Sequence, residues 1–307
     1  MPASHPSTQH LDSVPDMNSG AKNNASQLSI FSVDVEDWFH ILDVPATPQL
    51  HEWNGLPSRV ERNFTELLDL FSEKNVKVTC FFLAWVGERF PHLVREAVAR
   101  GHEIASHGYA HRLVYELTRD QFYEDALRAR KLLEDVSGSP VLGYRSAGFS
   151  VTDRTQWFFE TLVDAGYQYD SSVFPTPRGH GGMRTHLRAP NRITSNSKSI
   201  LEFPISLTDV LGKPLCFFGG GYLRLYPYWL VRQMARKVTA EGRPVVFYIH
   251  PREIDPDHPR LPMPARRRFK SYVNIRSTKD KLSRIFDDFP VTTFRDFLSR
   301  NSQFIEG

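Results

Sequence analysis

Short apolar runs alternate along this chain with segments whose apolar residues recur at helical spacing. The first run, 28–33, alternates in polarity and contains β-branched residues, which is typical of a strand. The segment 59–74 then places five apolar residues on one face of a helix: Val60, Phe64, Leu67, Leu68 and Phe71. The apolar run 76–83 comes next and predicts a buried strand.

The same alternation continues to residue 249. Helices are predicted over 91–100, 118–136, 152–165 and 226–240, and strands over 102–106, 141–144, near 167, over 200–205 and over 245–249. Gly101 and Gly166 end two of these helices, and Thr118 caps the start of another. Alternating strands and helices predict an α/β fold with a parallel sheet or barrel, whose strand carboxyl ends share one face.

Residues capable of chemistry come directly after five of the predicted strands. They are Asp34 and Glu36, then His107, Arg145, Asp170 and His250. Core packing does not explain such residues after five different strands, whereas active sites of α/β proteins lie at this edge. The sequence therefore predicts a catalytic site there.

The acidic cluster 34–37 and the histidine pair 107 and 111 offer the ligands of a metal site. One carboxylate and two imidazoles can hold a catalytic zinc-type ion and leave one position open for water. Each feature alone is more often an ordinary turn or a polar surface. Their combination favours a metal-dependent hydrolase.

Composition narrows the class of protein. The 307 residues are 40% hydrophobic and 24% charged, which is ordinary for a globular protein with a sizeable core. A net charge of +3 is too mild to predict nucleic-acid binding. Cys80 and Cys216 form no CxxC pair, so two buried thiols are expected.

The first 27 residues are polar and rich in Ser, Asn and Pro. They lack the basic start and apolar core of a signal peptide, and no later apolar run has the length of a membrane span. We expect a disordered polar tail over 1–27, no transmembrane segment and a cytoplasmic location. The sequence does not indicate an oligomeric state.

Five motifs follow one another along the chain. They are Asp34-Val-Glu-Asp37, His107-Gly-Tyr-Ala-His111, Arg145-Ser-Ala-Gly-Phe149, Asp170-Ser-Ser-Val-Phe-Pro175 and Phe247-Tyr-Ile-His250. This order resembles the NodB-type polysaccharide deacetylases, carbohydrate esterase family four. The fifth motif continues as His250-Pro-Arg-Glu253 and resembles the exopolysaccharide-cluster branch, which carries a C-terminal extension.

The resemblance implies a NodB homology fold, a distorted (β/α) barrel of about seven strands. It implies one domain over 28–307, in which 252–307 is the extension packed on the barrel. It also implies a hydrolase that removes N-acetyl groups from amino sugars in a polysaccharide or its lipid-linked precursor, during exopolysaccharide biosynthesis. Such an enzyme acts on carbon–nitrogen bonds other than peptide bonds.

The resemblance also implies roles for four catalytic residues. Asp34 is the expected general base, and His250 is the expected acid that protonates the departing amine. Arg145 is expected to pair with the base, and Asp170 is expected to hydrogen-bond His250 and raise its pKa. Backbone N–H groups around Gly148 and Phe149 are candidates for stabilising the oxyanion.

The expected metal ligands are His107, His111 and one carboxylate of the first motif. Asp37 is preferred because it lies where the strand turns, although strand periodicity places Glu36 on the same face as Asp34. Glu36 therefore stays an alternative to Asp37. Zinc is the expected divalent metal, with cobalt, nickel, manganese or iron as alternatives.

Two other functions stay open: a ring-amide hydrolase of the allantoinase or imidase kind, and a noncatalytic carbohydrate-binding barrel. Two further segments are predicted as loops. The glycines 219–221 do not form a phosphate loop and are expected near the sugar. The basic run 266–270 is expected to be solvated, with contact to a lipid-linked pyrophosphate or an acidic glycan as the alternative.

Overall fold

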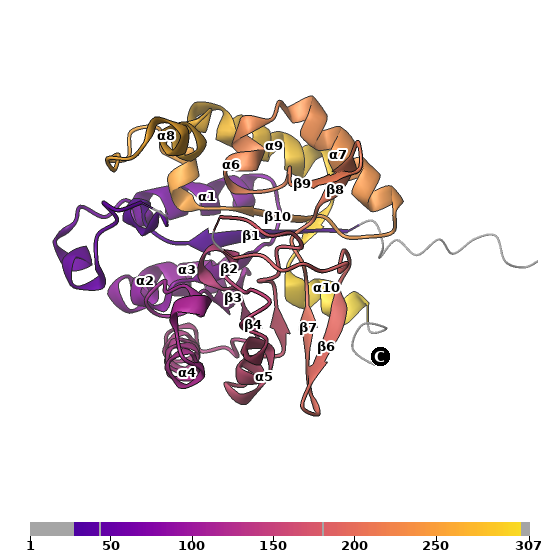
Figure 1. Ribbon diagram of the computed structural model, residues 1–307. Coiled ribbons are helices and arrows are strands. Elements are labelled where there is room, and N and C mark those ends of the chain that lie inside the picture. Colours follow the sequence, from indigo (N-terminus) through magenta and orange to yellow (C-terminus); the bar gives the residue numbers. More distant parts are fainter. Residues whose placement is uncertain (1–27, 43, 180, 302–307) are drawn as a thin grey trace, which may run out of the picture.

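The computed structural model describes residues 28–42, 44–179 and 181–301. The predicted polar tail over 1–27 and the last residues of the predicted extension lie outside these ranges. The described chain is built around a nine-stranded sheet, with helices packed along its outside (Figure 1).

Seven strands of this sheet run parallel in a single row. In spatial order they are β10 (Val246–Ile249), β1 (Ser29–Val35), β2 (Thr79–Phe82), β3 (Glu103–Ser106), β4 (Gly143–Tyr144), β5 (Tyr169–Asp170) and β7 (Lys198–Glu202). Parallel pairing places all seven carboxyl ends at one edge of the sheet. The register confirms this arrangement, since Val33 of β1 lies opposite both Ile249 and Cys80.

Two more strands extend the sheet. β6 (Asn191–Ser195) pairs antiparallel with β7, and β11 (Val291–Thr292) pairs with the start of β1. Strands β8 (Thr208–Val210) and β9 (Lys213–Leu215) form a separate hairpin. The α/β class is confirmed. Within the described residues the pairing is an open path from β10 to β6, and the strand direction turns strongly between β1 and β7 (Figure 1).

The five helices predicted from apolar spacing are all present. They are α1 (Val60–Glu73), α3 (Pro91–Ala99), α4 (Arg119–Ser137), α5 (Trp157–Asp164) and α7 (Tyr228–Ala240). Thr118 caps α4 by accepting the N–H of Gln121. Helix α5 begins later than predicted, because Thr152 and Thr155 hydrogen-bond each other in a turn before it.

Five further helices were not predicted: α2 (Ala84–Arg89), α6 (Gly220–Leu225), α8 (Ala265–Tyr272), α9 (Thr278–Asp288) and α10 (Phe294–Arg300). Short 3₁₀ turns are η2 (Trp38–His40), η3 (Leu50–Gly55), η4 (Val114–Glu116), η5 (Ala147–Phe149), η6 (Pro251–Ile254) and η7 (Ile275–Ser277). Among the described residues, no helix combines the length and the apolar character that crossing a membrane requires.

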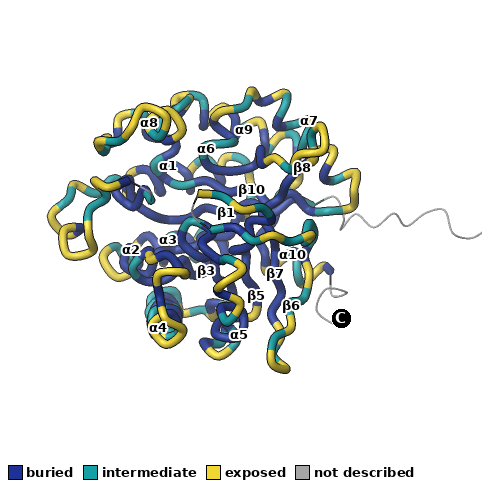
Figure 2. The backbone as a smooth tube through the Cα atoms, in the orientation of Figure 1, coloured by how far each residue is buried: buried dark blue, intermediate teal, exposed yellow. Residues whose placement is uncertain are grey.

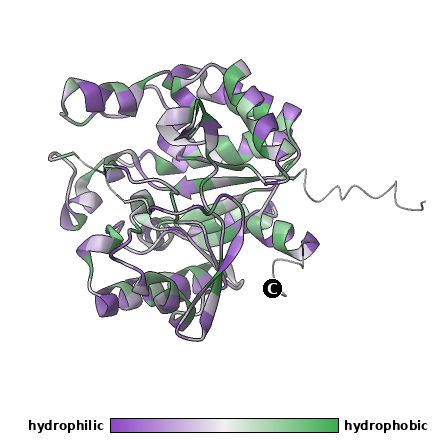
Figure 3. Ribbon diagram, turned by 45° about the vertical axis from the view of Figure 1, so that its right-hand side comes forward, coloured by the Kyte–Doolittle hydropathy of each residue, from purple (hydrophilic) through white to green (hydrophobic). Residues whose placement is uncertain are grey.

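Strands β1, β2, β3 and β10 are buried along their whole length, whereas β6 at the end of the sheet is partly exposed (Figure 2). Hydrophobic residues are frequent in the central strands (Figure 3). On β1, Phe31 and Val33 join the cluster that packs under the outer helices. Ile30 belongs to a second cluster, which includes Phe294 of α10. Because side chains alternate along a strand, Asp34 shares the face of Ile30. Both predicted free cysteines are buried.

Candidate active site

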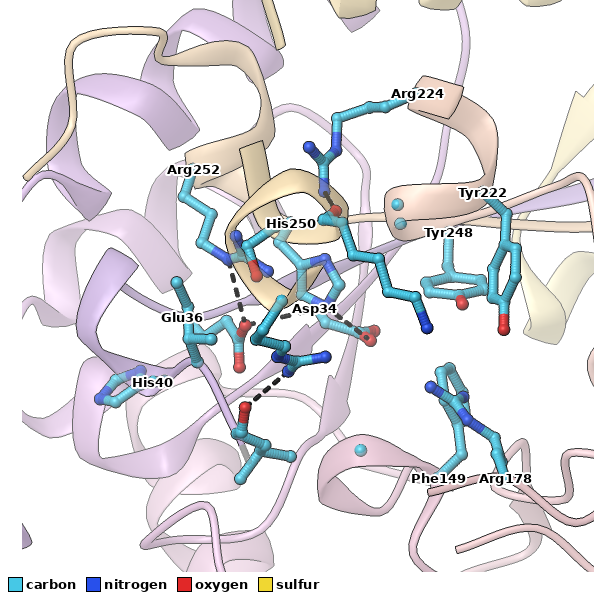
Figure 4. Close-up of a pocket in the computed structure, with 18 of the residues that line it drawn as sticks. Asp34, Glu36, His40, Phe149, Arg178, Tyr222, Arg224, Tyr248, His250 and Arg252 are labelled. Carbon is cyan, nitrogen blue, oxygen red and sulfur yellow. Dashed lines mark hydrogen bonds and ion pairs between the residues drawn. The ribbon is translucent and has the colours of Figure 1, made fainter. Parts of the chain in front are cut away.

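A cleft of about 570 Å³ lies at the carboxyl edge of the parallel strands (Figure 4). The cleft is lined by Asp34 near the end of β1, Glu36 directly after β1, His107 and His111 after β3, and His250 after β10. Arg145 and Asp170 are fully buried and do not belong to the lining. The structure therefore brings the predicted strand-end residues together. Some of them line the cleft, and Arg145 and Asp170 are buried away from its surface.

Glu36, His107 and His111 form a buried cluster in this cleft. One potential ligand atom from each lies within 4.8 Å of the other two. The Oε2 atom of Glu36 is 2.7 Å from Nε2 of His111, but this contact does not have the geometry of a hydrogen bond. Within the described residues, Oε2 accepts no hydrogen bond. A carboxylate and two imidazoles aimed at a common region form a suitable donor set for a divalent cation.

The protonation states also suit a cation. Nδ1 of His107 is 2.8 Å from the carbonyl oxygen of Arg145, which can only accept, so Nδ1 carries the proton and Nε2 keeps its lone pair. Burial lowers the pKa of His107 to about 4. Burial would raise the pKa of Glu36, but His111 and His250 hold it well below its usual range. The cluster thus combines an ionised carboxylate with a neutral imidazole.

Asp37 does not join this cluster, which corrects the expectation that it is the carboxylate ligand. Its side chain caps η2 by accepting the N–H of Trp38 at 2.8 Å. It also accepts the hydroxyl of Ser58 at 2.5 Å and the N–H of Arg59 at 3.1 Å. Both carboxylate oxygens are therefore used to hold the start of α1 against the first motif, and Glu36 takes the place beside the histidines.

The loop between the two histidines depends on backbone conformations that are rare for most residues. Gly108 has φ +76° and His111 has φ +52°. Asp125 of α4 accepts the N–H of Tyr109 at 2.9 Å and so holds the loop. A Cβ atom on Gly108 would lie 3.0 Å from Oδ2 of Asp125. Glycine at this position lets the loop pass close to α4 and present His111 to the cleft.

Replacing Gly108 with alanine is expected to lower the free energy of unfolding by about 3 kcal/mol, because strain at positive φ adds to crowding against Asp125. Gly138, at the end of α4, is the matched control, since its φ is +65° and nothing lies within 4 Å of a built Cβ. Gly138→Ala should cost about 1 kcal/mol. Urea unfolding measures both, and equal losses would contradict the crowding argument.

Arg145 and Asp34 form the predicted ion pair. Nη1 of Arg145 lies 2.7 Å from Oδ1 of Asp34, and both side chains are buried. Arg145 also donates to the hydroxyl of Ser32 at 2.7 Å and to the carbonyl of Ser171 at 3.1 Å. Its guanidinium lies 4.2 Å from the ring centroid of Phe81. Arg145 is thus fixed on all sides and holds Asp34 at the base of the cleft.

His250 is oriented by Glu253, which corrects the expected pairing of His250 with Asp170. Nδ1 of His250 is 3.1 Å from Oε2 of Glu253, while its Nε2 lies 3.8 Å from Asp34 and 3.7 Å from Glu36. Glu253 also accepts Nε of Arg224 at 2.8 Å. Burial lowers the pKa of His250, but the carboxylates of Glu36 and Glu253 outweigh it, so the pKa is raised overall.

Asp170 has a structural position instead. It accepts the hydroxyl of Ser172 at 2.6 Å and lies against Glu202 of β7. Burial raises the pKa of Asp170 to about 6, and burial together with Asp170 raises the pKa of Glu202 well above its usual range. Glu202 therefore keeps its proton. It accepts the N–H of Val173 at 2.9 Å, so the pair holds the loop after β5.

Three functional residues were missed by sequence reasoning: Glu253, Arg224 and His40. Glu253 stands in the quoted fifth motif, three residues after His250, and this spacing was the available signal. His40 lies three residues after the end of the first motif and lines the cleft. Its Nδ1 accepts the N–H of Asp37 at 3.0 Å. Burial lowers the pKa of His40 well below its usual value, so its ring is neutral.

Other expectations for the cleft need correction. The N–H of Phe149 already donates to the carbonyl of Ser146 at 3.1 Å, which leaves Gly148 as the backbone candidate beside the cleft. The glycine run opens helix α6, with Gly219 at its N-cap. The basic run 266–270 lies in helix α8, and its members Arg267, Phe269 and Lys270 line the cleft.

Comparison with family models divides the described chain into two parts. Residues 54–169 match the family described as polysaccharide deacetylase. Residues 171–299 match a domain of unknown function, DUF3473. The boundary between these matches separates the two histidines of the buried cluster from His250 and Glu253.

Curated relatives match the first part. A peptidoglycan deacetylase of Helicobacter pylori is 28% identical over 113 residues, which are 37% of this chain and 38% of that protein. A peptidoglycan-N-acetylglucosamine deacetylase of Bacillus cereus is 29% identical over 103 residues, which are 34% of this chain and 46% of that protein. The matches therefore span less than half the length of these relatives.

Solved structures match nearly the whole chain in fold. One from Mycobacterium smegmatis, provisionally assigned to the polysaccharide deacetylases, has TM-score 0.60 and 19% identity and covers 90% of each chain. A probable polysaccharide deacetylase of Pseudomonas aeruginosa has TM-score 0.57 and 18% identity, over 91% of this chain and 92% of that one. The Puue allantoinase has TM-score 0.59 and 18% identity, over 95% and 98%.

Proposed function

We propose that this chain, whose residues 54–169 match the polysaccharide deacetylase family, hydrolyses N-acetyl groups of amino sugars in a glycan. One observation carries the proposal: Glu36, His107 and His111 lie beside both Asp34 and His250 in a single cleft. The cleft thus holds a metal-type donor set, a carboxylate base and an imidazole acid, which amide hydrolysis requires.

Glu36, His107 and His111 would hold the divalent metal, with zinc as the first candidate and cobalt, nickel, manganese or iron as alternatives. Such an ion lowers the pKa of a water and polarises a carbonyl group. The hydrogen bond from His107 to the carbonyl of Arg145 keeps the Nε2 lone pair directed away from that carbonyl. Asp37 supports this arrangement indirectly, because it fixes the backbone next to Glu36.

Asp34 would take a proton from the water that attacks the acetamide carbon. Arg145 holds the carboxylate through Oδ1, which leaves Oδ2 facing His250. His250 would then give the proton on its Nε2 to the amine nitrogen as the carbon–nitrogen bond breaks. Glu253 accepts from Nδ1 and thereby fixes the orientation of the ring. The products are acetate and a free amino sugar.

Acetate release from N-acetylglucosamine oligomers tests the proposal. Protein stripped of metal by a chelator should release none, and added zinc or cobalt should restore release in wild-type protein but not in His107→Ala. Allantoin is assayed in parallel. Hydrolysis of allantoin without release from glycans would contradict the proposal in favour of a ring-amide hydrolase, and glycan binding without any hydrolysis would favour a noncatalytic protein.

A further inference from the structure

Five arginine and lysine side chains line the cleft around the proposed catalytic residues, and four of them form one group. They are Arg178, Arg252, Arg267 and Lys270, which we call the cationic rim. All four belong to the region 171–299, which matches the domain of unknown function. They reach the cleft from three different segments: the loop after β5, turn η6 and helix α8.

The rim has little opposing charge. The only carboxylates among the described lining residues are Asp34 and Glu36. Asp34 is already paired with Arg145, and Glu36 contacts His111 at 2.7 Å. A fifth lining cation, Arg224, is paired with Glu253. The cleft therefore has an excess of positive charge, and a recessed surface concentrates the resulting field on whatever binds there.

Arg252 and Lys270 have donors available for a ligand. The side chain of Arg252 is 11% exposed, and its Nε and Nη1 atoms make no hydrogen bond within the described residues. Its only described ion pair is a long one, 4.0 Å from Nε to Glu36. The ammonium of Lys270 forms no ion pair in the described part of the chain. The two Arg252 nitrogens are buried, so leaving them without a partner is costly and an anionic ligand would satisfy them, whereas the exposed Lys270 offers its charge from the mouth of the cleft.

Helix α8, which carries Arg267 and Lys270, is held against the cleft by side-chain hydrogen bonds. Arg224 donates to the carbonyl oxygens of Lys270 at 3.1 Å and Val273 at 3.0 Å, which ties the end of α8 to Glu253. Arg267 donates to the carbonyl of Leu42 at 2.6 Å and so connects α8 to the chain that follows the first motif. Helix α8 is thus fixed at both sides of the cleft.

The far side of the cleft adds aromatic surface to the charge. Arg178 lies beside Phe149, across from Tyr222 and Tyr248, while Arg252 lies on the other side of His250 next to Glu36 (Figure 4). The guanidinium of Arg178 is 4.5 Å from the ring centroid of Phe174. Aromatic faces suit sugar rings, and a guanidinium suits a carboxylate or a phosphate.

We propose that the cationic rim binds an anionic group next to the N-acetylated sugar, so that the substrate is an acidic glycan. This inference rests on the proposed function and specifies its substrate class. The anionic group is a carboxylate or a phosphate. It comes either from an acidic sugar of a polysaccharide or from the phosphate of a lipid-linked precursor.

The test compares acetate release from three substrates: a neutral N-acetylglucosamine oligomer, an oligomer of alternating N-acetylglucosamine and uronic acid, and N-acetylglucosamine pyrophosphate on a short lipid. The ratio of kcat/KM for an acidic substrate to that for the neutral one should exceed about tenfold and fall with ionic strength. Lys270→Gln and Arg252→Gln should each lower this ratio about tenfold through KM, and Lys270→Arg should restore it. The preferred acidic substrate identifies the source.

Arg268→Gln is the matched control, because Arg268 is exposed on the same helix and does not line the cleft. Its ratio should equal that of wild type. A wild-type ratio near one, or equal ratios in wild type and Lys270→Gln, would overturn the inference while leaving deacetylation intact. If no substrate releases acetate, the proposed function fails; calorimetric binding of the same acidic and neutral oligomers then decides the inference, and equal affinities overturn it.

Discussion

Glu36→Gln is expected to abolish both metal binding and acetate release, whereas the same change at the neighbouring Asp37 preserves both. Glu36 lies with His107 and His111, while the oxygens of Asp37 accept hydrogen bonds from η2 and the start of α1. Loss of a partner behind a metal ligand costs about 10- to 100-fold in affinity, so loss of the ligand itself should cost more than about a hundredfold.

The opposite order is expected for stability. Asp37→Asn puts an amide donor where Asp37 now accepts from Ser58 and Arg59, and should lower the free energy of unfolding by about 2 kcal/mol. Glu36→Gln should lower it by less, because it removes the charge that faces His111 at 2.7 Å but leaves no backbone donor without an acceptor. Metal content by atomic spectroscopy, acetate release and urea unfolding are measured on both variants. Retained metal in Glu36→Gln, or its loss in Asp37→Asn, would return the ligand role to Asp37.

His250→Ala is expected to lower kcat between about a hundredfold and ten-thousandfold while leaving metal content unchanged. His250 lies 3.7 Å or more from the carboxylates of Asp34 and Glu36 and is not part of the buried cluster. Its loss should therefore remove proton donation to the amine without removing a ligand. The measurement is kcat and KM for acetate release, with metal content determined on the same samples.

Glu253→Gln is the milder variant in the same experiment, because it alters the environment of His250 without removing the ring. The Glu253 carboxylate raises the pKa of His250, so its replacement should lower that pKa and move the limb of the pH profile that needs protonated His250 to lower pH. We expect about a tenfold loss of kcat at neutral pH, since the ring is less well oriented. An unchanged profile in Glu253→Gln, or metal loss in His250→Ala, would contradict these roles.

Much of the fold follows from local sequence patterns. Helix α1 has a strongly periodic apolar face, and α4 begins at a threonine that caps it as predicted. Helix α8 was not predicted, because its eight residues are mostly polar and its basic run 266–270 was interpreted as a solvated loop. The structure holds this helix by hydrogen bonds from Arg224 and Arg267. These contacts join distant parts of the chain and leave no periodic signal.

The candidate site was likewise predicted only where local sequence patterns determine it. Parallel strands place their carboxyl ends together, so strand positions alone predicted that Asp34, His107 and His250 meet. The choice between neighbouring carboxylates depended on distant contacts. Asp37 is turned away by Ser58, 21 residues later, and Asp170 is occupied by Ser172 and Glu202. Asp37 was assigned from its place at the turn after the first strand, and Asp170 from the family resemblance. Tertiary hydrogen bonds override both assignments.

The position of β1 inside the sheet bears on how this protein can be divided. β1 pairs with β2 on one side and with β10 and β11 on the other, although β10 and β11 come more than 200 residues later. A fragment ending at residue 170 would expose the backbone donors and acceptors along one side of β1, and unpaired strand edges promote self-association. It would also lack His250 and Glu253. The boundary between the two family matches therefore exists in the sequence but not in the folded sheet, because β1 pairs with strands from both sides of it.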